Sequence, residues 1–340
     1  MQDDYFSLMQ KLAPDLAQEI ERRALVLERI DALLPVGRRV LSGRLNLPER
    51  EVRTIATLLK ELGLVELDAA GMSLTPGADE ILPAARRFSR DLRGLTKLEM
   101  ELEKKLDVPK VYVTAGDADT DAHVLHEVGR IAAGRLRGFL QSGSTLAVTG
   151  GETIHEVALA LQHGLPMNVM VVPARGGIGR ALETQANTIA SEIAKRLGGH
   201  HRLMHLPDRV DDQALTELKK LSEVTETLDL LQRADVVLHG IGRADEMSQK
   251  RQLPPALMSE VLQRGAVAEA YGCYFDRDGQ LVYSASSVAH DIGKLKPNCA
   301  LLAVAAGARK AEAVTAVMRN RPHAMLVTDE GAARAILAKR

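Results

Sequence analysis

The hydrophobic and polar positions of the first 75 residues predict a small helical domain with a β-hairpin. Apolar side chains recur every three or four residues, which predicts helices over residues 14–34, 37–45 and 48–62. The segment LVELDAAGMSLT then predicts two short strands around an Ala70-Gly71 turn. Helix, short helix, tight turn near Asn46, helix and hairpin follow one another as in a winged helix-turn-helix.

From residue 108 onward, short apolar runs alternate with amphipathic segments. This alternation predicts an α/β domain with a mostly parallel, doubly wound, Rossmann-like sheet. The predicted strands are 110–114, 145–149, 168–173, 201–206, 236–240, 267–275, 280–284, 301–305 and 325–328.

A helical segment connects the two parts, and we expect it to break into two pieces around Pro83. The expected organisation is a winged helix-turn-helix over residues 1–80, a helical linker over 81–107 and a large domain over 108–340. Such a linker could pair with its copy in a dimer.

The amino-acid composition excludes several functional classes of protein. The 340 residues suggest about two domains, and 44 basic against 45 acidic residues exclude a globally basic nucleic-acid coat. Five Tyr, four Phe and no Trp argue against a single-strand binder that works by stacking. Cys273 and Cys299 form neither a disulfide framework nor a zinc pattern, so we expect no metal. The sequence also lacks a signal peptide and an apolar run of membrane-spanning length, so we expect a soluble, cytoplasmic protein without a membrane partner.

Charge is concentrated locally in the helix-turn-helix. Residues 38–60 carry six basic side chains and two carboxylates, a net +4. An exposed basic helix face suits phosphates and base edges, so we expect double-stranded DNA as a partner. The alternative is an ordinary solvated face on a small helical cap. The candidate DNA-binding residues are Arg38, Arg39, Arg50, Arg53, Thr54 and Thr57.

Four glycine-rich loops follow predicted strands, at residues 149–153, 175–179, 240–245 and 306–310. Bare backbone amides near helix N-termini, with nearby Arg or Lys, suit phosphate groups. None of these loops matches a P-loop or the Gly-x-Gly-x-x-Gly dinucleotide fingerprint. We therefore expect no nucleotide cofactor, and several separated anion sites that fit a sugar phosphate, including one with two phosphates.

Longer blocks make the chain resemble the SorC family of bacterial transcriptional regulators. They are LPVGRRVL, LKELGLVELDAAGMSLTPGA, AVTGGETI, VVPARGGIG, GIGRADEM, GAVAEAYGCYFDRDG and AVAAGARKAEAV. The resemblance implies a winged helix-turn-helix joined to a domain similar to sugar-phosphate isomerases and deaminases. It also implies a non-enzymatic repressor of central glycolytic genes that assembles as a dimer or tetramer and is released from its operator by fructose 1,6-bisphosphate.

The same resemblance implies an effector site. Thr149, Gly150, Gly151 and Thr153 would cradle one phosphate, and Arg175, Gly177 and Gln185 would line the sugar and the second phosphate. Glu269 would accept hydrogen bonds from sugar hydroxyls, Lys310 would neutralise a phosphate, and either Lys250 or Arg251 would contact the ligand. Glu152 departs from the family, which usually has a hydroxyl residue there, and an acid beside a phosphate is repulsive unless it points away.

An enzyme is the alternative interpretation, because the same pocket could serve a sugar-phosphate isomerase or deaminase with an accessory helical domain. Glu269 is the best candidate base, followed by Asp245 and His239. Each also has a non-catalytic interpretation: Glu269 as a hydroxyl acceptor, Asp245 as a helix N-cap and His239 as a satisfied residue at a strand end. A complete winged helix favours the regulator.

Overall fold

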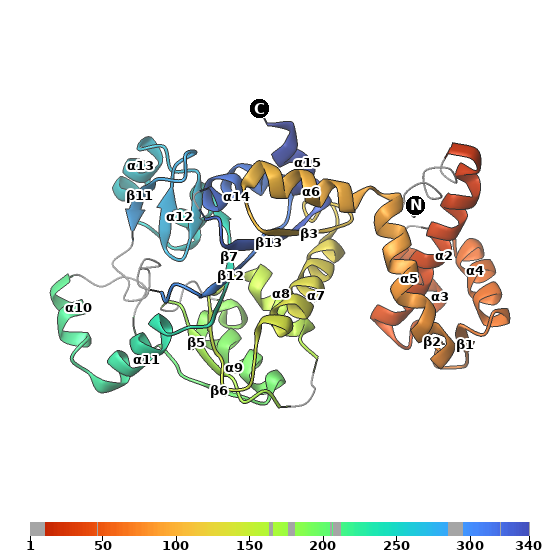
Figure 1. Ribbon diagram of the computed structural model, residues 1–340, viewed down its shortest axis with the longest axis horizontal. Coiled ribbons are helices and arrows are strands. Elements are labelled where there is room, and N and C mark those ends of the chain that lie inside the picture. Colours follow the sequence, from red (N-terminus) through yellow and green to blue (C-terminus); the bar gives the residue numbers. More distant parts are fainter. Residues whose placement is uncertain are drawn as a thin grey trace. The chain divides into compact units, whose positions relative to one another are not determined.

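The computed structural model describes residues 11–45, 47–162, 166–175, 181–204, 206, 212–284, 295–319 and 321–339. The chain divides into two compact units, Met1–Thr96 and Lys97–Arg340 (Figure 1). None of the helices in these described ranges is long and apolar enough to cross a bilayer.

The first unit has the predicted winged helix-turn-helix order. Its elements are α2 (Pro14–Leu33), α3 (Arg38–Leu45), α4 (Glu49–Glu61), β1 (Val65–Leu67), β2 (Met72–Leu74) and α5 (Pro76–Leu92). Ile30, Leu41, Ile55 and Met72 bring α2, α3, α4 and the hairpin into one buried core. Asn46, in the predicted turn, lies outside the described residues.

The predicted helix break at Pro83 is wrong. Helix α5 continues through Pro83, whose side chain is exposed, and ends at Leu92. Gly94 has a φ of 67°, and its N–H donates to the carbonyl of Asp91. The helix thus tolerates the lost hydrogen bond and the ring contact that an interior proline introduces, and it ends where glycine adopts the left-handed conformation. Helix α6 (Leu95–Leu106) follows.

The second unit contains the predicted parallel sheet. Its seven strands lie in the order β3-β13-β12-β7-β4-β5-β6, and every pair is parallel. They are β3 (Lys110–Thr114), β4 (Thr145–Val148), β5 (Met170–Pro173), β6 (His200–His201), β7 (Val236–Gly240), β12 (Ala300–Val304) and β13 (Ala324–Asp329).

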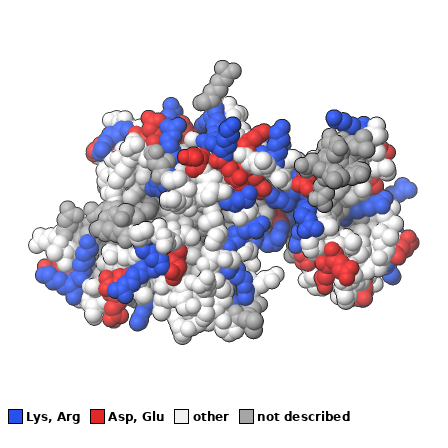
Figure 2. All heavy atoms as spheres, viewed as in Figure 1, with Lys and Arg blue, Asp and Glu red and all other residues white. Residues whose placement is uncertain are grey.

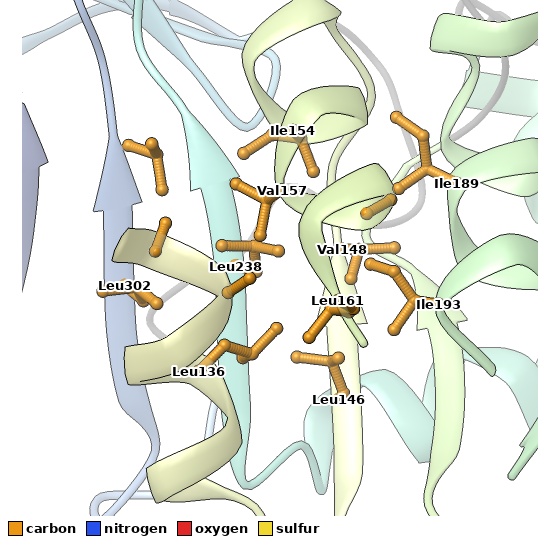
Figure 3. Close-up of a cluster of buried hydrophobic side chains, with 14 of the residues drawn as sticks. Leu136, Leu146, Val148, Ile154, Val157, Leu161, Ile189, Ile193, Leu238 and Leu302 are labelled. Atoms are coloured by element: carbon orange, nitrogen blue, oxygen red, sulfur yellow. The ribbon is translucent and has the colours of Figure 1, made fainter. Parts of the chain in front are cut away.

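Helices α7 (Ala122–Phe139), α8 (Glu152–Ala160) and α9 (Ala186–Leu197) cover one face of this sheet. Figure 3 shows Ile154 and Val157 of α8 beside Val148 of β4 and Leu238 of β7. This packing fixes the start of α8 against the ends of the two central strands. The second unit also contains α10 (Asp212–Leu218), α11 (Ser222–Gln232), α14 (Ala311–Met318), α15 (Glu330–Ala338) and the 3₁₀ turns η1 (Leu182–Thr184) and η3 (Ala308–Lys310).

The order of the strands creates one switch point. The chain runs outward from β4 through β5 to β6, and then returns to β7 and runs outward in the other direction through β12 to β13. The loops that follow β4 and β7 therefore diverge. In open α/β sheets, ligands bind in the crevice at this position, outside the carboxyl ends of the strands.

A second, antiparallel sheet of order β11-β10-β9-β8 was not predicted. Its strands are β8 (Gly242–Arg243), β9 (Ala268–Ala270), β10 (Cys273–Phe275) and β11 (Leu281–Ser284), with α12 (Ala244–Lys250) and α13 (Pro255–Gln263) beside it. The single strand predicted over 267–275 is wrong, because the chain reverses at Tyr271 and Gly272 and the two halves pair with each other.

Asp329, at the end of β13, ties two loops and the first turn of α15 together from a fully buried position. One carboxylate oxygen accepts from the N–H groups of Ala118 (2.7 Å) and Gly307 (2.8 Å), and the other accepts from Ala332 (3.0 Å). Burial raises the pKa of this carboxyl, while the three backbone donors oppose that rise.

Replacing Asp329 should destabilise the large unit strongly. The substitution Asp329→Ala leaves two buried N–H groups and one part-buried N–H group without this acceptor, and we expect a loss of about 3 kcal/mol or more. The matched control is Asp278→Ala, because Asp278 is 76% exposed and pairs with Arg319 on the surface; it should cost less than about 0.5 kcal/mol. Urea denaturation measures both, and equal losses would contradict the role of Asp329.

Candidate functional site

A pocket of about 760 Å³ lies at the switch point of the parallel sheet. The chain segments after β4, β5, β7 and β12 contribute to it, together with α12 and β9 of the small sheet. Ten of the eleven predicted effector residues line it: Thr149, Gly150, Gly151, Thr153, Arg175, Gln185, Lys250, Arg251, Glu269 and Lys310. The remaining one, Gly177, lies outside the described residues.

Three buried charged side chains form the deepest part of the pocket. Glu269 Oε1 accepts from Arg251 Nη2 at 2.7 Å and from Arg175 Nη1 at 3.3 Å. The side chains of Arg175, Arg251 and Glu269 are 1%, 4% and 5% exposed. Two guanidinium groups meet one carboxylate where water is largely excluded, and guanidinium groups in such a place suit an anionic ligand.

A two-residue turn between β9 and β10 positions Glu269. Tyr271 and Gly272 both have positive φ, 57° and 87°, as in the primed turns that close tight hairpins. The N–H of Gly272 donates to Glu269 Oε1 at 2.6 Å. A side chain at residue 272 would meet the guanidinium of Arg175 at 3.1 Å, so glycine lets the turn lie against this arginine.

The structure separates Lys250 from Arg251, which the sequence left open. Both line the pocket, but Lys250 is exposed at the end of α12, whereas the side chain of Arg251 is buried against Glu269. Arg251 is the C-cap residue of α12. Arg251 therefore belongs to the deep part of the pocket and Lys250 to its rim.

Helix α8 begins at the pocket with its first backbone amides. Gly151 has a φ of 119° and supplies no capping side chain. Its own N–H donates to the carbonyl of Thr184 at 2.8 Å, so it is not available to a ligand. The first-turn amides of a helix have no intrahelical acceptor, which leaves those of Glu152 and Thr153. A Cβ at Gly150 would lie 2.7 Å from the carbonyl of Thr184, so this close approach requires glycine.

The 306–310 loop does not offer the bare amides that its glycine predicts. Carboxylates occupy them: Gly307 N–H donates to Asp329, Ala308 N–H to Asp117 at 3.3 Å, and Arg309 N–H to Asp119 at 2.8 Å. These aspartates come from distant parts of the sequence, so the local pattern could not reveal them. The contribution of this loop to the pocket is therefore its two basic side chains.

Lys310 is the basic side chain best placed for an anion. Arg309 is held by Asp119 at 2.8 Å and by Glu246 at 2.9 Å. The side-chain ammonium of Lys310, by contrast, makes no hydrogen bond or ion pair within the described part of the chain. Burial lowers the pKa of its amine, and the neighbouring Arg309 adds to this effect. An anion at this point would stabilise the charged amine.

The 240–245 loop also differs from its prediction as a bare phosphate loop. Gly242 and Arg243 form strand β8, and Arg243 donates two hydrogen bonds to Asp245, at 3.0 and 2.6 Å. His239 is fully buried, and burial lowers its pKa to about 3, so the ring is neutral. It lies 4.1 Å from the ring of Tyr271. Neither Asp245 nor His239 lines the pocket.

Sequence patterns did not identify part of the pocket wall. Five basic side chains (Arg175, Lys250, Arg251, Arg309 and Lys310) and five carboxylates (Glu152, Glu156, Glu183, Glu246 and Glu269) line it. Glu246 follows the candidate Asp245, and Arg309 precedes the candidate Lys310. The structure shows that Glu246 and Arg309 form an ion pair and that both line the pocket. Within the described ranges, no cluster of three His, Cys, Asp or Glu side chains could hold a metal ion.

The first unit exposes the candidate DNA-binding side chains. Arg38, Arg39, Arg50, Arg53, Thr54 and Thr57 are all exposed. The hydroxyls of Thr54 and Thr57 donate to carbonyls one turn earlier in α4, at 3.0 and 2.9 Å. The hairpin from 65 to 74 carries no basic residue, so the positive charge lies on α3 and α4. Elsewhere basic and acidic side chains are interspersed on the visible surface (Figure 2).

Comparisons with known proteins find related families for both the N-terminal and the C-terminal part of the chain. Residues 90–338 match the family described as "Putative sugar-binding domain", and residues 20–88 match "CggR N-terminal DNA binding domain". The chain is 35% identical over 332 residues to the central glycolytic genes regulator of Priestia megaterium, with 97% of each chain covered.

Solved structures similar to this chain also include regulators of the SorC family. A SorC family transcriptional regulator from Enterococcus faecalis is 34% identical and superposes with a TM-score of 0.65, covering 71% of this chain and 99% of that one. The full-length sorbitol operon regulator from Klebsiella pneumoniae is 17% identical with a TM-score of 0.66, and covers 94% of this chain and 98% of that one. The second likeness shows the fold alone.

The buried charge cluster predicts a large effect of Glu269 on stability. The substitution Glu269→Ala removes the buried carboxylate that Arg175 and Arg251 share, and we expect a loss of about 3–5 kcal/mol in phosphate-free buffer. The control is Glu260→Ala, because this exposed residue makes only a surface pair with Arg264 and should change stability by less than about 1 kcal/mol. A loss below about 1 kcal/mol for Glu269→Ala would contradict the role of Glu269 in stabilising the two arginines.

Proposed function

Because the chain belongs to the SorC family of transcriptional regulators, we propose that it is a repressor whose affinity for operator DNA is lowered by a phosphorylated sugar. The observation that carries the proposal is the pocket at the switch point, with Arg175 and Arg251 buried at its base and Lys310 on its wall. The same chain carries an exposed basic helix face in a winged helix-turn-helix. A ligand pocket and a DNA-binding face in one chain fit a ligand-controlled regulator.

Fructose 1,6-bisphosphate is the effector that we propose. The pocket has two separate regions for anions: the Arg175–Arg251 pair, and Lys310 near the first amides of α8. A sugar with a phosphate at each end would use both regions at once. Gln185 and Glu269 would then contact the hydroxyls between the phosphates. The name of the Priestia megaterium relative supports central glycolytic genes as the targets.

Operator binding would use α4 as the recognition helix. Arg50 and Arg53 lie on its exposed face, and arginine can contact both guanine edges and phosphates. Thr54 and Thr57 would contact phosphates or a thymine methyl, and Arg38 and Arg39 of α3 would add phosphate contacts. Operators are commonly read by symmetric oligomers. We therefore propose a dimer or tetramer that acts in the cytoplasm, where its DNA and its metabolite are found.

An isomerase or deaminase is the less favoured alternative. A catalytic base must reach the proton that it removes. Glu269 Oε1 already accepts three hydrogen bonds, and Asp245 is held by Arg243. His239 is enclosed in the protein interior. These engagements support the structural interpretation of all three residues, and therefore a binding protein without catalytic activity.

The DNA half of the proposal predicts a loss of operator affinity for Arg50→Ala and for Arg53→Ala. Each should weaken binding by about 1–3 kcal/mol if the side chain contacts a base, or reduce the salt dependence by about one unit of slope if it contacts a phosphate. Arg87→Ala is the control, because Arg87 is exposed on α5 outside the helix-turn-helix. Gel shifts at several salt concentrations measure these effects. Unchanged binding for both α4 variants would exclude α4 as the recognition helix.

The effector half predicts that Lys310→Ala keeps operator binding and loses the response to fructose 1,6-bisphosphate. The lost cation contacts only the effector, whereas a coupling of about 1–3 kcal/mol between the two sites would change wild-type DNA affinity 5- to 150-fold. Lys219→Ala, an exposed lysine after α10, is the control. If Lys310→Ala responds at wild-type concentrations, the effector binds elsewhere. A wild type that responds to no sugar phosphate, or that turns one over, would refute the effector assignment.

A further inference from the structure

Glu152 and Lys310 line the same pocket with opposite charges and without a direct contact. Glu152 is the exposed first residue of α8, and Lys310 ends the η3 turn after β12. In the described part of the chain, neither side chain makes a hydrogen bond or an ion pair. The carboxylate of Glu152 still acts on Lys310 electrostatically, because it raises the pKa of the lysine against the larger lowering by burial. The space between them is therefore open to a ligand group.

A group in this space would meet donors on one side and an acceptor on the other. The ammonium of Lys310 and the first amides of α8 donate hydrogen bonds, whereas the ionised carboxylate of Glu152 can only accept them. A dianionic phosphate ester has acceptors only, so its oxygens would face the carboxylate with like charge and no proton between them. A monoanionic phosphate ester satisfies both sides, because one P–O–H donates to Glu152 while the other oxygens accept.

We propose that Glu152 is a specificity-determining residue that makes this end of the pocket bind a phosphate ester in its singly protonated form. The inference rests on the proposed function, since it assumes that a phosphorylated sugar occupies the pocket. The balance is simple: the dianionic ester takes one proton from solvent, one O–H bond forms, and no other covalent bond changes. The bound proton lies between the phosphate and the Glu152 carboxylate.

Binding at this subsite then depends on pH. The second pKa of a phosphate monoester is about 6, so at pH 7.5 only about 3% of it is singly protonated, against about half at pH 6. The affinity of the wild-type protein should therefore rise about fifteenfold between pH 7.5 and pH 6. The other titratable or charged groups that line this part of the pocket are His155 and Glu156 on α8, Glu183 on η1, Glu246 and Lys250 on α12, and Arg309 on η3 beside Lys310.

The test is calorimetric titration of the full-length protein with fructose 1,6-bisphosphate at pH 7.5, in two buffers with different ionisation enthalpies. The dependence on buffer gives the number of protons taken up on binding. We expect close to one proton for the wild type and close to none for Glu152→Gln, whose amide can donate to a dianionic phosphate. Glu152→Gln should also bind about tenfold more tightly at pH 7.5 and lose most of that advantage at pH 6. Glu260→Gln, the same charge change on the exposed face of α13, should behave as the wild type.

Any other outcome contradicts either this inference alone or the proposed effector together with it. If the wild type binds the bisphosphate without taking up a proton, or if Glu152→Gln takes up as many protons as the wild type, Glu152 does not hold the proton and the inference is wrong while the proposed function stands. If neither protein binds the bisphosphate at either pH, the proposed effector fails and this inference fails with it. A titration with inorganic phosphate shows whether the subsite acts alone, and weaker binding to Glu152→Gln than to the wild type would also refute the role.

Discussion

The carboxylate of Glu269 joins the two sheets of the large unit. Arg175 follows β5 of the parallel sheet, whereas Arg251 and Glu269 belong to the small antiparallel assembly. A buried carboxylate with one guanidinium on each side has to be matched closely, because a charge pair away from water is stable only when its geometry is good. This requirement holds the small sheet over the carboxyl ends of the parallel strands. The pocket exists because of that placement.

Topology supplies the other half of the site. The strands alone would give a crevice between the diverging loops after β4 and β7, and Val148 and Leu238 at the strand ends pack with Ile154 and Val157 of α8 beside it. The helix start is thus fixed by apolar packing, and its polar first turn is left for chemistry. Residues of α8 that pack in the core therefore lie within a few positions of residues that face the pocket. The pocket wall is polar, and it is held by the apolar packing behind it.

The sequence predicted the features that depend on local pattern and missed those that depend on distant partners. Alternating strands and helices identified the parallel sheet, and ten predicted effector residues line one pocket. The strand predicted over 267–275 was wrong, because the Tyr271-Gly272 turn interrupts an apolar run that looks continuous. The amides of the 306–310 loop are taken by Asp117, Asp119 and Asp329, and no spacing rule could show this. The choice between Lys250 and Arg251 needed the orientation of the end of α12.

These three aspartates have a consequence for how a ligand meets the protein. Their carboxylates accept hydrogen bonds from the backbone N–H groups of the 306–310 loop, as a bound anion does in many phosphate loops, and so they hold the conformation of this loop. A loop with its own internal acceptors is already ordered before any ligand arrives, so little of the binding free energy is lost to freezing the backbone. That free energy remains available for shifting the equilibrium between two conformations of the protein, and a ligand that regulates a protein acts through such a shift.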